Sequence, residues 1–141
     1  MAKVNFYLLK QDSEQARQAL ACRLAEQQST QGQQVYILTS SSEDAQQMDQ
    51  LLWSFAQESF LPHALAGSDV AGEVSVKIGH DTQPPVGTTC VLNLGTAPPL
   101  SQPTLSAIAE FVLNHDEAKA HSRTLWNLYK QLGYELQHHQ L

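Results

Sequence analysis

Basic side chains are scarce in this sequence. Lys and Arg together number 8, against 14 Asp and Glu, which gives a formal net charge of −6. A protein that binds duplex DNA over a broad surface needs many cations to neutralise phosphates. The composition therefore argues against a general duplex-DNA binder, although it leaves room for a local basic patch.

Cysteine and long apolar runs are also scarce. Cys22 and Cys90 are the only cysteines, and their wide separation gives no metal-ligand spacing. No apolar run approaches the length that spans a bilayer, and the chain opens on a strand-like segment rather than on a secretory signal. We therefore expect a cytoplasmic protein with two free, buried thiols.

The glycines of a phosphate-binding loop are missing. The first strand-like segment runs into Lys10-Gln11-Asp12-Ser13, where a dinucleotide site or a P-loop would place glycines to let the backbone approach phosphates. Asp12 followed by Gln15 instead fits a capping box at the start of a helix. The sequence therefore predicts no nucleotide site of either kind.

Catalytic and metal-binding patterns are missing as well. His115 and His121 lack the i, i+4 spacing that places two imidazoles on one helical face, and no serine lies in a nucleophile-elbow pattern. The histidines, His63 among them, are better explained as solvated or capping residues. The sequence therefore predicts no catalytic residue, no bound metal and no cofactor.

What is present is the alternating pattern of an α/β protein. A chain of 141 residues with 42% hydrophobic residues predicts one domain over 1–141. Continuously apolar strands between helical segments predict a Rossmann-like α/β fold, with a mostly parallel central sheet flanked by helices and no phosphate-binding loop. The expected strands are Lys3–Lys10, Val35–Thr39, Phe60–Leu65, Val74–Ile78 and Thr89–Leu94, and the expected helices are Ser13–Gln28, Glu43–Trp53 and His115–Gly133. The segment Leu105–Leu113 fits either a helix or a strand.

The terminal helix carries an uneven distribution of charge. Lys119, Arg123, Trp126 and Lys130 fall within an arc of about 60° at roughly 100° per residue. One interpretation is a solvated face whose tryptophan shields the core, and another is a site for an acidic peptide with an aromatic tip. The opposite face is expected to supply the core contacts: Ala118, Leu125, Leu128 and Leu132.

A second candidate surface follows the second predicted helix. Trp53, Phe55 and Phe60 are more aromatic residues than the end of a helix normally holds, and Pro62 follows them closely. Core packing explains one or two of these rings. A patch that binds a partner subunit would explain the surplus, and the sequence alone leaves both interpretations open.

These segments also resemble a known family. Asn5–Leu9, Met48–Trp53, Glu58–Gly67 and Leu128–Tyr134 are similar to blocks of the chi subunits of the bacterial DNA polymerase III clamp-loader assembly. The block from Glu58 to Gly67, with its Ser-Phe-Leu-Pro-His-Ala-Leu-Ala-Gly run, is the most specific of these. The resemblance covers nearly the whole chain, although residues 69–104 match only loosely.

The resemblance implies a non-catalytic accessory subunit with a Rossmann-like fold. Such subunits pair one-to-one with the psi subunit, which tethers them to the clamp loader. They also bind the acidic, phenylalanine-ended tail of single-stranded DNA-binding protein, so that they reach DNA indirectly. By position, the psi interface would include Trp53 and Phe60, with Phe55 and Pro62 of the same region, and the tail-binding site would include Lys119, Arg123, Trp126 and Lys130.

Two positions depart from the family's pattern. Trp126 stands where relatives carry tyrosine, and Asn127 stands where a basic residue is common. The first departure keeps an aromatic wall of different depth, and the second removes one contact to a carboxylate. Two other function classes stay open from the sequence: weak direct binding of nucleic acid through the terminal helix, and a degenerate nucleotide-binding enzyme.

Overall fold

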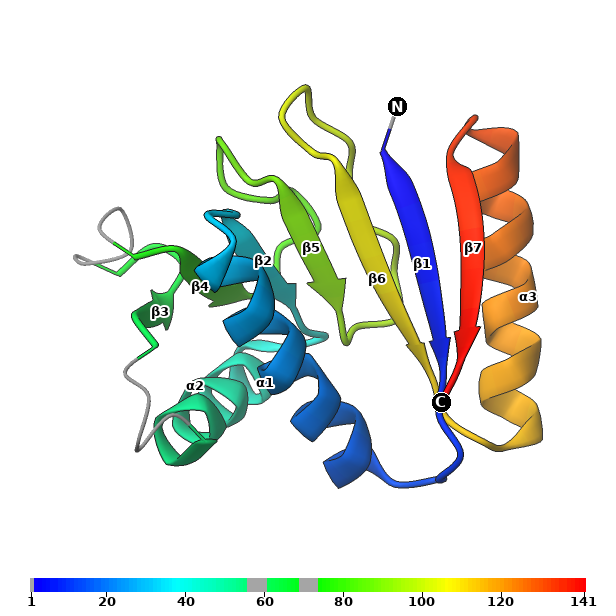
Figure 1. The fold of residues 1–141 in the computed structure, drawn as a ribbon, viewed down its shortest axis with the longest axis horizontal. Helices are drawn as coiled ribbons and strands as arrows, with labels where there is room; N and C mark the ends of the chain where they lie inside the picture. The colour runs from blue at the N-terminus through cyan, green and yellow to red at the C-terminus, as the bar shows by residue number, and fades with distance from the viewer. Residues whose placement is uncertain (1, 56–60, 69–73) are drawn as a thin grey trace.

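The computed structural model describes residues 2–55, 61–68 and 74–141. The elements of this described part all belong to one layered arrangement around a single sheet (Figure 1). In chain order they are β1 (Lys3–Leu8), α1 (Glu14–Thr30), β2 (Val35–Leu38), α2 (Ser42–Phe55), β3 (His63–Leu65), β4 (Val76–Gly79), β5 (Cys90–Asn93), β6 (Ala107–Val112), α3 (Asp116–Gln131) and β7 (Glu135–Gln140).

The sheet is parallel throughout its described strands. Its order is β3-β4-β2-β5-β6-β1-β7, and every strand pair in it runs parallel. All four residues of β2 and all four of β5 are buried, as expected for central strands covered on both faces. The predicted α/β fold is confirmed.

The helices divide between the two faces of the sheet. Buried side chains of α1 and α2 pack together with one face, and those of α3 pack with the other. Alternate residues along β1 divide accordingly: Val4 and Phe6 join the α3 cluster, whereas Tyr7 and Leu9, the residue after the strand, join the α1 and α2 cluster. Cys22 and Cys90 are free and buried, as predicted. No helix in the described ranges combines the length and apolar character needed to cross a membrane.

Local signals around α1 and β6 differ from the sequence prediction. The N-cap of α1 is Ser13 rather than Asp12, because the Ser13 side chain accepts the hydrogen bond from the Ala16 amide. The ambiguous segment Leu105–Leu113 forms strand β6, which lies between β5 and β1. The residues of β6 are nearly all buried, so the segment has no exposed polar face whose spacing would distinguish a strand from a helix.

The edge strand β7 was not predicted. Gly133 has φ of +89°, a left-handed conformation that ends α3 and turns the chain back along β1. In β7 the only apolar residue is Leu136, and both faces of the strand are largely exposed. A strand with so little apolar pattern is defined by its backbone pairing with β1, which the sequence does not display.

The buried face of α3 also differs from the prediction. Leu125 is buried as expected, but Tyr129 is 0% exposed, whereas Leu128 and Leu132 are 37% and 56% exposed. The helix is therefore rotated relative to the expected face. Tyr129 points inward because its hydroxyl donates a hydrogen bond of 2.6 Å to the buried Glu110 carboxylate on β6.

Candidate protein-interaction sites

Helix α3 presents its cations to solvent beside the β1 and β7 edge of the sheet. His115 caps its N-terminus by accepting a hydrogen bond from the Ala118 amide. Lys119, Arg123 and Lys130 are exposed, and Trp126 is half-buried. The three cations therefore point outward, as the helical spacing predicted.

A large hollow lies at one end of this helix face. It has a volume of about 530 Å³ and is formed where the ends of β1, β6 and β7 meet α3. Lys10, Lys119 and Arg123 supply its cations. Apolar side chains at the strand ends complete the lining: Leu8, Leu9, Val112 and Leu113. The hollow thus combines an apolar floor with a positive rim.

A second hollow of about 380 Å³ lies beside the first. Trp126 forms one wall, with its ring centroid 5.2 Å from that of Phe6 and 6.1 Å from that of His138. Leu8 and Arg123 belong to the lining of both hollows. We call Lys119, Arg123, Trp126 and these two adjoining hollows the α3 site.

Trp126 has both of the roles that the sequence left open. Its indole packs against the core cluster on the α3 face, next to Phe6, and so shields apolar surface. The same indole lines the smaller hollow and is therefore not sealed inside the protein. An aromatic group that is held by core packing on one side is preorganised to contact a ligand on the other.

Lys130 lies outside the α3 site. It is exposed in the last turn of α3 and lines neither of the two hollows. Seven residues separate it from Arg123, which corresponds to a rise of about 10 Å along the helix. The structure thus brings together Lys119, Arg123 and Trp126, and leaves Lys130 as a distant charge on the same helix.

Sequence reasoning missed two contributors to the α3 site. Lys10 follows β1, and His138 comes from the unpredicted strand β7. The signal for Lys10 was available in principle, because the carboxyl ends of parallel strands meet at one edge of the sheet. His138 could not have been placed without knowing that β7 pairs with β1.

The second candidate surface lies at the end of α2. Trp53 is 52% exposed and Phe55 is 38% exposed, whereas Pro62 is half-buried. Phe60 lies outside the described residues. Phe55 lies about 200° around the helix from Trp53 and lines a separate hollow with residues of α1, so the structure does not bring these two rings together. We call Trp53 and Pro62 the α2 surface. Exposed aromatic side chains of this size are unusual on a solvated helix end and are typical of a protein interface.

Trp53 is supported by a buried histidine. Its ring centroid lies 4.5 Å from that of His63. The His63 ring nitrogens contact two backbone oxygens, that of Leu61 at 2.8 Å and that of Asp49 at 3.2 Å. The prediction that His63 is a solvated or capping residue is therefore wrong: the side chain is buried and fixes the plane against which the indole packs.

The thiols offer no reactive group. Burial raises the pKa of Cys22 to about 11 and that of Cys90 to about 12, so both thiols are protonated at neutral pH. Among the residues that the structure describes, no group of three or more His, Cys, Asp or Glu side chains is placed to hold a metal ion.

Comparison with known proteins agrees with the resemblance read from the sequence. A family model described as "DNA polymerase III chi subunit, HolC" matches residues 1–137. A curated relative from Pseudomonas aeruginosa, named DNA polymerase III subunit chi, is 34% identical over 142 aligned residues, covering 100% of this chain and 98% of the relative. A relative of the same name from Escherichia coli is 28% identical over 141 residues, covering 96% of each chain. The chain therefore belongs to the family of DNA polymerase III chi subunits and is an accessory subunit in DNA replication.

Proposed function

We propose that this chain links the DNA polymerase III assembly to single-stranded DNA that is coated with single-stranded DNA-binding protein. It catalyses no reaction itself. The α3 site binds the acidic C-terminal tail of the coating protein, and the α2 surface binds the psi subunit. The observation that carries the proposal is the position of Arg123, which lies between a hollow with a cationic rim and a hollow with an aromatic wall.

Each hollow suits one part of such a tail. The carboxylates bind Lys10, Lys119 and Arg123 at the rim of the larger hollow, where Arg123 offers a planar pair of donors. The terminal phenylalanine ring enters the smaller hollow and packs on Trp126. Because the two hollows adjoin, a short tail can occupy both at once.

The energetics predict a salt-sensitive site of low affinity. Exposed charge pairs contribute about 0.5–1 kcal/mol each, and burial of one aromatic anchor contributes about 2 kcal/mol or more. With three cations and one aromatic anchor these contributions total about 3.5–5 kcal/mol, which corresponds to a Kd of roughly 0.2–3 mM, and the cost of ordering the tail weakens binding further. Salt screens the charge pairs more than the aromatic contact, so the aromatic contact persists at high ionic strength.

Fluorescence anisotropy with labelled ligands tests the α3 site. An acidic peptide ending in Phe is compared with the same peptide ending in Ala, and with a bare single-stranded oligonucleotide. The proposal expects the Phe-ended peptide to bind best and the oligonucleotide to bind weakly or not at all. If the oligonucleotide binds more tightly than the peptide, the chain is a direct nucleic-acid-binding module instead.

The α2 surface supports the second partner. Trp53 exposes apolar area that a partner subunit would bury, and its packing on His63 keeps the indole in place. Burial of such anchors at the centre of an interface is typical of stable subunit contacts. Through psi the chain joins the clamp loader, which would place it in the cytoplasm with the rest of the polymerase assembly.

A further inference from the structure

A small cavity lies at the point where the connections between strands change direction along the sheet. Neighbouring strands β1 and β6 send the chain to opposite sides: β1 leads through α1 to β2, and β6 leads through α3 to β7. Helices α1 and α3 also lie on opposite faces. In open parallel sheets, the crevice outside the strand ends at such a point is where ligands bind. Here that crevice contains a cavity of about 170 Å³.

One wall of the cavity is a buried carboxyl group. Glu110 on β6 is 4% exposed. The Tyr129 hydroxyl donates to its Oε2 at 2.6 Å, and the Asn93 side-chain amide donates to the same Oε2 at 2.8 Å. Within the described part of the chain, no hydrogen bond reaches Oε1. One oxygen of this carboxyl group is therefore fixed by the protein, and the other is left for a ligand.

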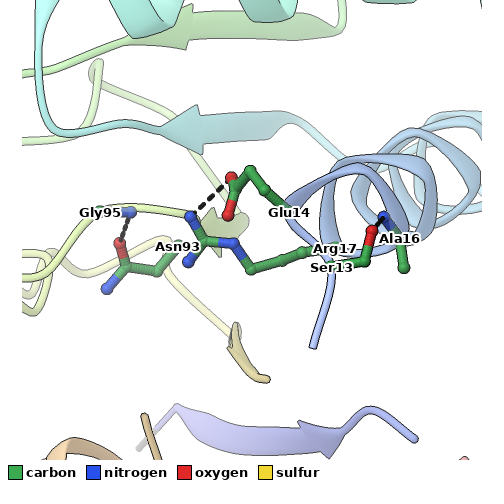
Figure 2. A network of polar contacts seen from close by, with 6 residues as sticks. All are labelled: Ser13, Glu14, Ala16, Arg17, Asn93 and Gly95. Atoms are coloured by element: carbon green, nitrogen blue, oxygen red, sulfur yellow. Dashed lines mark hydrogen bonds and ion pairs between the residues drawn. The ribbon is translucent and has the colours of Figure 1, made fainter. Parts of the chain in front are cut away.

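The orientation of the Asn93 amide is fixed by its hydrogen bonds. Its Oδ1 accepts the amide N–H of Gly95 at 2.9 Å, a bond drawn in Figure 2. Its Nδ2 must then be the group that donates to Glu110, and it also donates to the Ala97 carbonyl at 3.0 Å. Because both ends of the amide are engaged, Asn93 cannot turn to present its Oδ1 to Glu110.

The cavity lining also includes Arg17, which has a donor that no acceptor in the described part of the chain meets. Arg17 of α1 pairs with Glu14 through Nη2 at 2.8 Å, as Figure 2 shows. Its Nε is buried and has no hydrogen-bond partner among the residues that the structure describes. Arg17, Glu14 and Glu110 all line the cavity. A buried N–H that gives up water without gaining an acceptor is costly, so a ligand that supplies an acceptor there is stabilised.

We propose that this cavity binds a small carboxylate between Arg17 and Glu110. On binding, the Arg17 guanidinium turns so that its buried Nε–H reaches the cavity and donates to the carboxylate. The carboxylate accepts a second hydrogen bond from a proton on Glu110 Oε1. Glu110 takes up that proton when the ligand enters, so the net charge around Arg17 does not change. The short apolar tail of the ligand packs on the hydrophobic lining of the cavity: Phe6, Phe111, Leu113 and Leu125.

The volume of the cavity and the protonation state of Glu110 limit which ligand can bind. At about 30 Å³ for each water, the cavity has room for about five non-hydrogen atoms. A ligand of so few atoms has a Kd on the millimolar scale. Burial raises the pKa of Glu110 to about 7, against the hydrogen bonds from Tyr129 and Asn93 and the charge of Arg17, which lower it.

Binding should therefore weaken as Glu110 loses its proton. With a pKa of about 7, the protonated fraction falls from about 0.9 at pH 6 to about 0.1 at pH 8, so the apparent affinity falls about tenfold. Other titratable groups also face the cavity. They are Glu14 of α1, His115 at the cap of α3 and His121 of α3, while Tyr129 contacts Glu110 directly.

The test uses the whole chain and sodium propionate, which stays ionised over this pH range. The readout is the NMR resonance of the Arg17 Nε–H group, followed as propionate is added. We expect a saturable shift of this resonance and a Kd about tenfold lower at pH 6 than at pH 8. Arg17→Lys, which keeps the charge but removes the Nε–H, should lose the binding, whereas the exposed control Arg23→Lys should keep it.

Glu110→Gln separates this site from other pH-dependent groups. The glutamine amide resembles the protonated carboxyl group, so this variant should bind propionate with an affinity that no longer changes with pH, although His115 and His121 remain. An Arg17 Nε–H resonance that does not move, or a Glu110→Gln variant with the parent's pH dependence, would overturn the proposal. These two measurements decide the matter even if Arg17→Lys does not fold.

Discussion

Arg123 and Trp126 contribute different interactions to the α3 site, so their removal should have different signatures. We expect Arg123→Ala to weaken binding of the acidic, Phe-ended peptide about two- to fivefold, and to reduce its salt dependence because a charge pair is lost. Trp126→Ala should weaken binding about thirtyfold with little change in salt dependence. Anisotropy titrations at two salt concentrations measure both effects.

Matched variants control for these two. Arg23→Ala removes another exposed helical arginine outside the α3 site and should leave peptide affinity unchanged. Lys130→Ala should weaken binding less than twofold, because Lys130 lines neither hollow. Circular dichroism verifies that each variant is folded. Peptide binding that is equal for Arg123→Ala, Trp126→Ala and the parent would show that the tail binds elsewhere.

Glu110 should make stability depend on pH. Its folded-state pKa of about 7 lies above the ordinary value of 4.5 because the side chain is buried. Folding therefore favours the protonated form, and the free energy of unfolding should fall as pH rises from about 4.5 to about 7. The loss amounts to roughly 3 kcal/mol at 1.36 kcal/mol per pKa unit.

Urea unfolding of the parent and of Glu110→Gln measures this effect. Glutamine cannot ionise, so the variant should lack the decline between pH 5 and pH 7 that Glu110 causes. The parent should lose stability relative to the variant over that range. Parallel pH profiles for the two proteins would mean that Glu110 titrates near its ordinary pKa in the folded state.

At the scale of elements, the end of α2 supplies a surface that the core does not need. Trp53 is half exposed and Phe55 is more than one-third exposed, so both can be removed without opening a large cavity. We expect Trp53→Ala to abolish co-purification with psi and to change the melting temperature little. Leu52→Ala is the contrasting variant, because Leu52 is 0% exposed and its loss should destabilise the fold by about 2–5 kcal/mol.

The comparison of these two variants decides whether the Trp53 indole serves the psi interface or the stability of the fold. If Trp53→Ala retains psi and instead melts at a much lower temperature, Trp53 serves the fold through its contact with His63. If it retains both psi and stability, the interface lies on another face of the molecule.

At the scale of the whole molecule, the two proposed surfaces lie at opposite ends of the sheet. Helix α2 lies near β3 and β4, whereas α3 lies beside β7, as Figure 1 shows. Partners on these surfaces should not compete. We expect the affinity for the acidic peptide to be the same with and without saturating psi, as measured by anisotropy. A large loss of peptide affinity in the complex would place both partners on overlapping surfaces.

Much of the fold could be predicted because its central strands are apolar at nearly every position, Asn93 being the exception. The runs Val35–Leu38 and Cys90–Asn93 required burial on both faces, and this requirement implied a parallel sheet between helices. The edge strand β7 carries no such pattern, because its stability comes from backbone pairing with β1. The rotation of α3 that exposes Leu128 and Leu132 was not predictable from helical spacing alone, because it depends on the contact of Tyr129 with Glu110 on β6.

Residue types and spacings were enough to indicate the family, to show that no glycine-rich phosphate loop follows the first strand, and to align Lys119, Arg123 and Trp126 along one helix. These features are local, since they depend on residue type and spacing within a single segment. Only the tertiary structure added Lys10 and His138 to that line and placed Arg17 opposite Glu110. Those residues come from distant segments, and it is the pairing of parallel strands that brings their ends to a common edge.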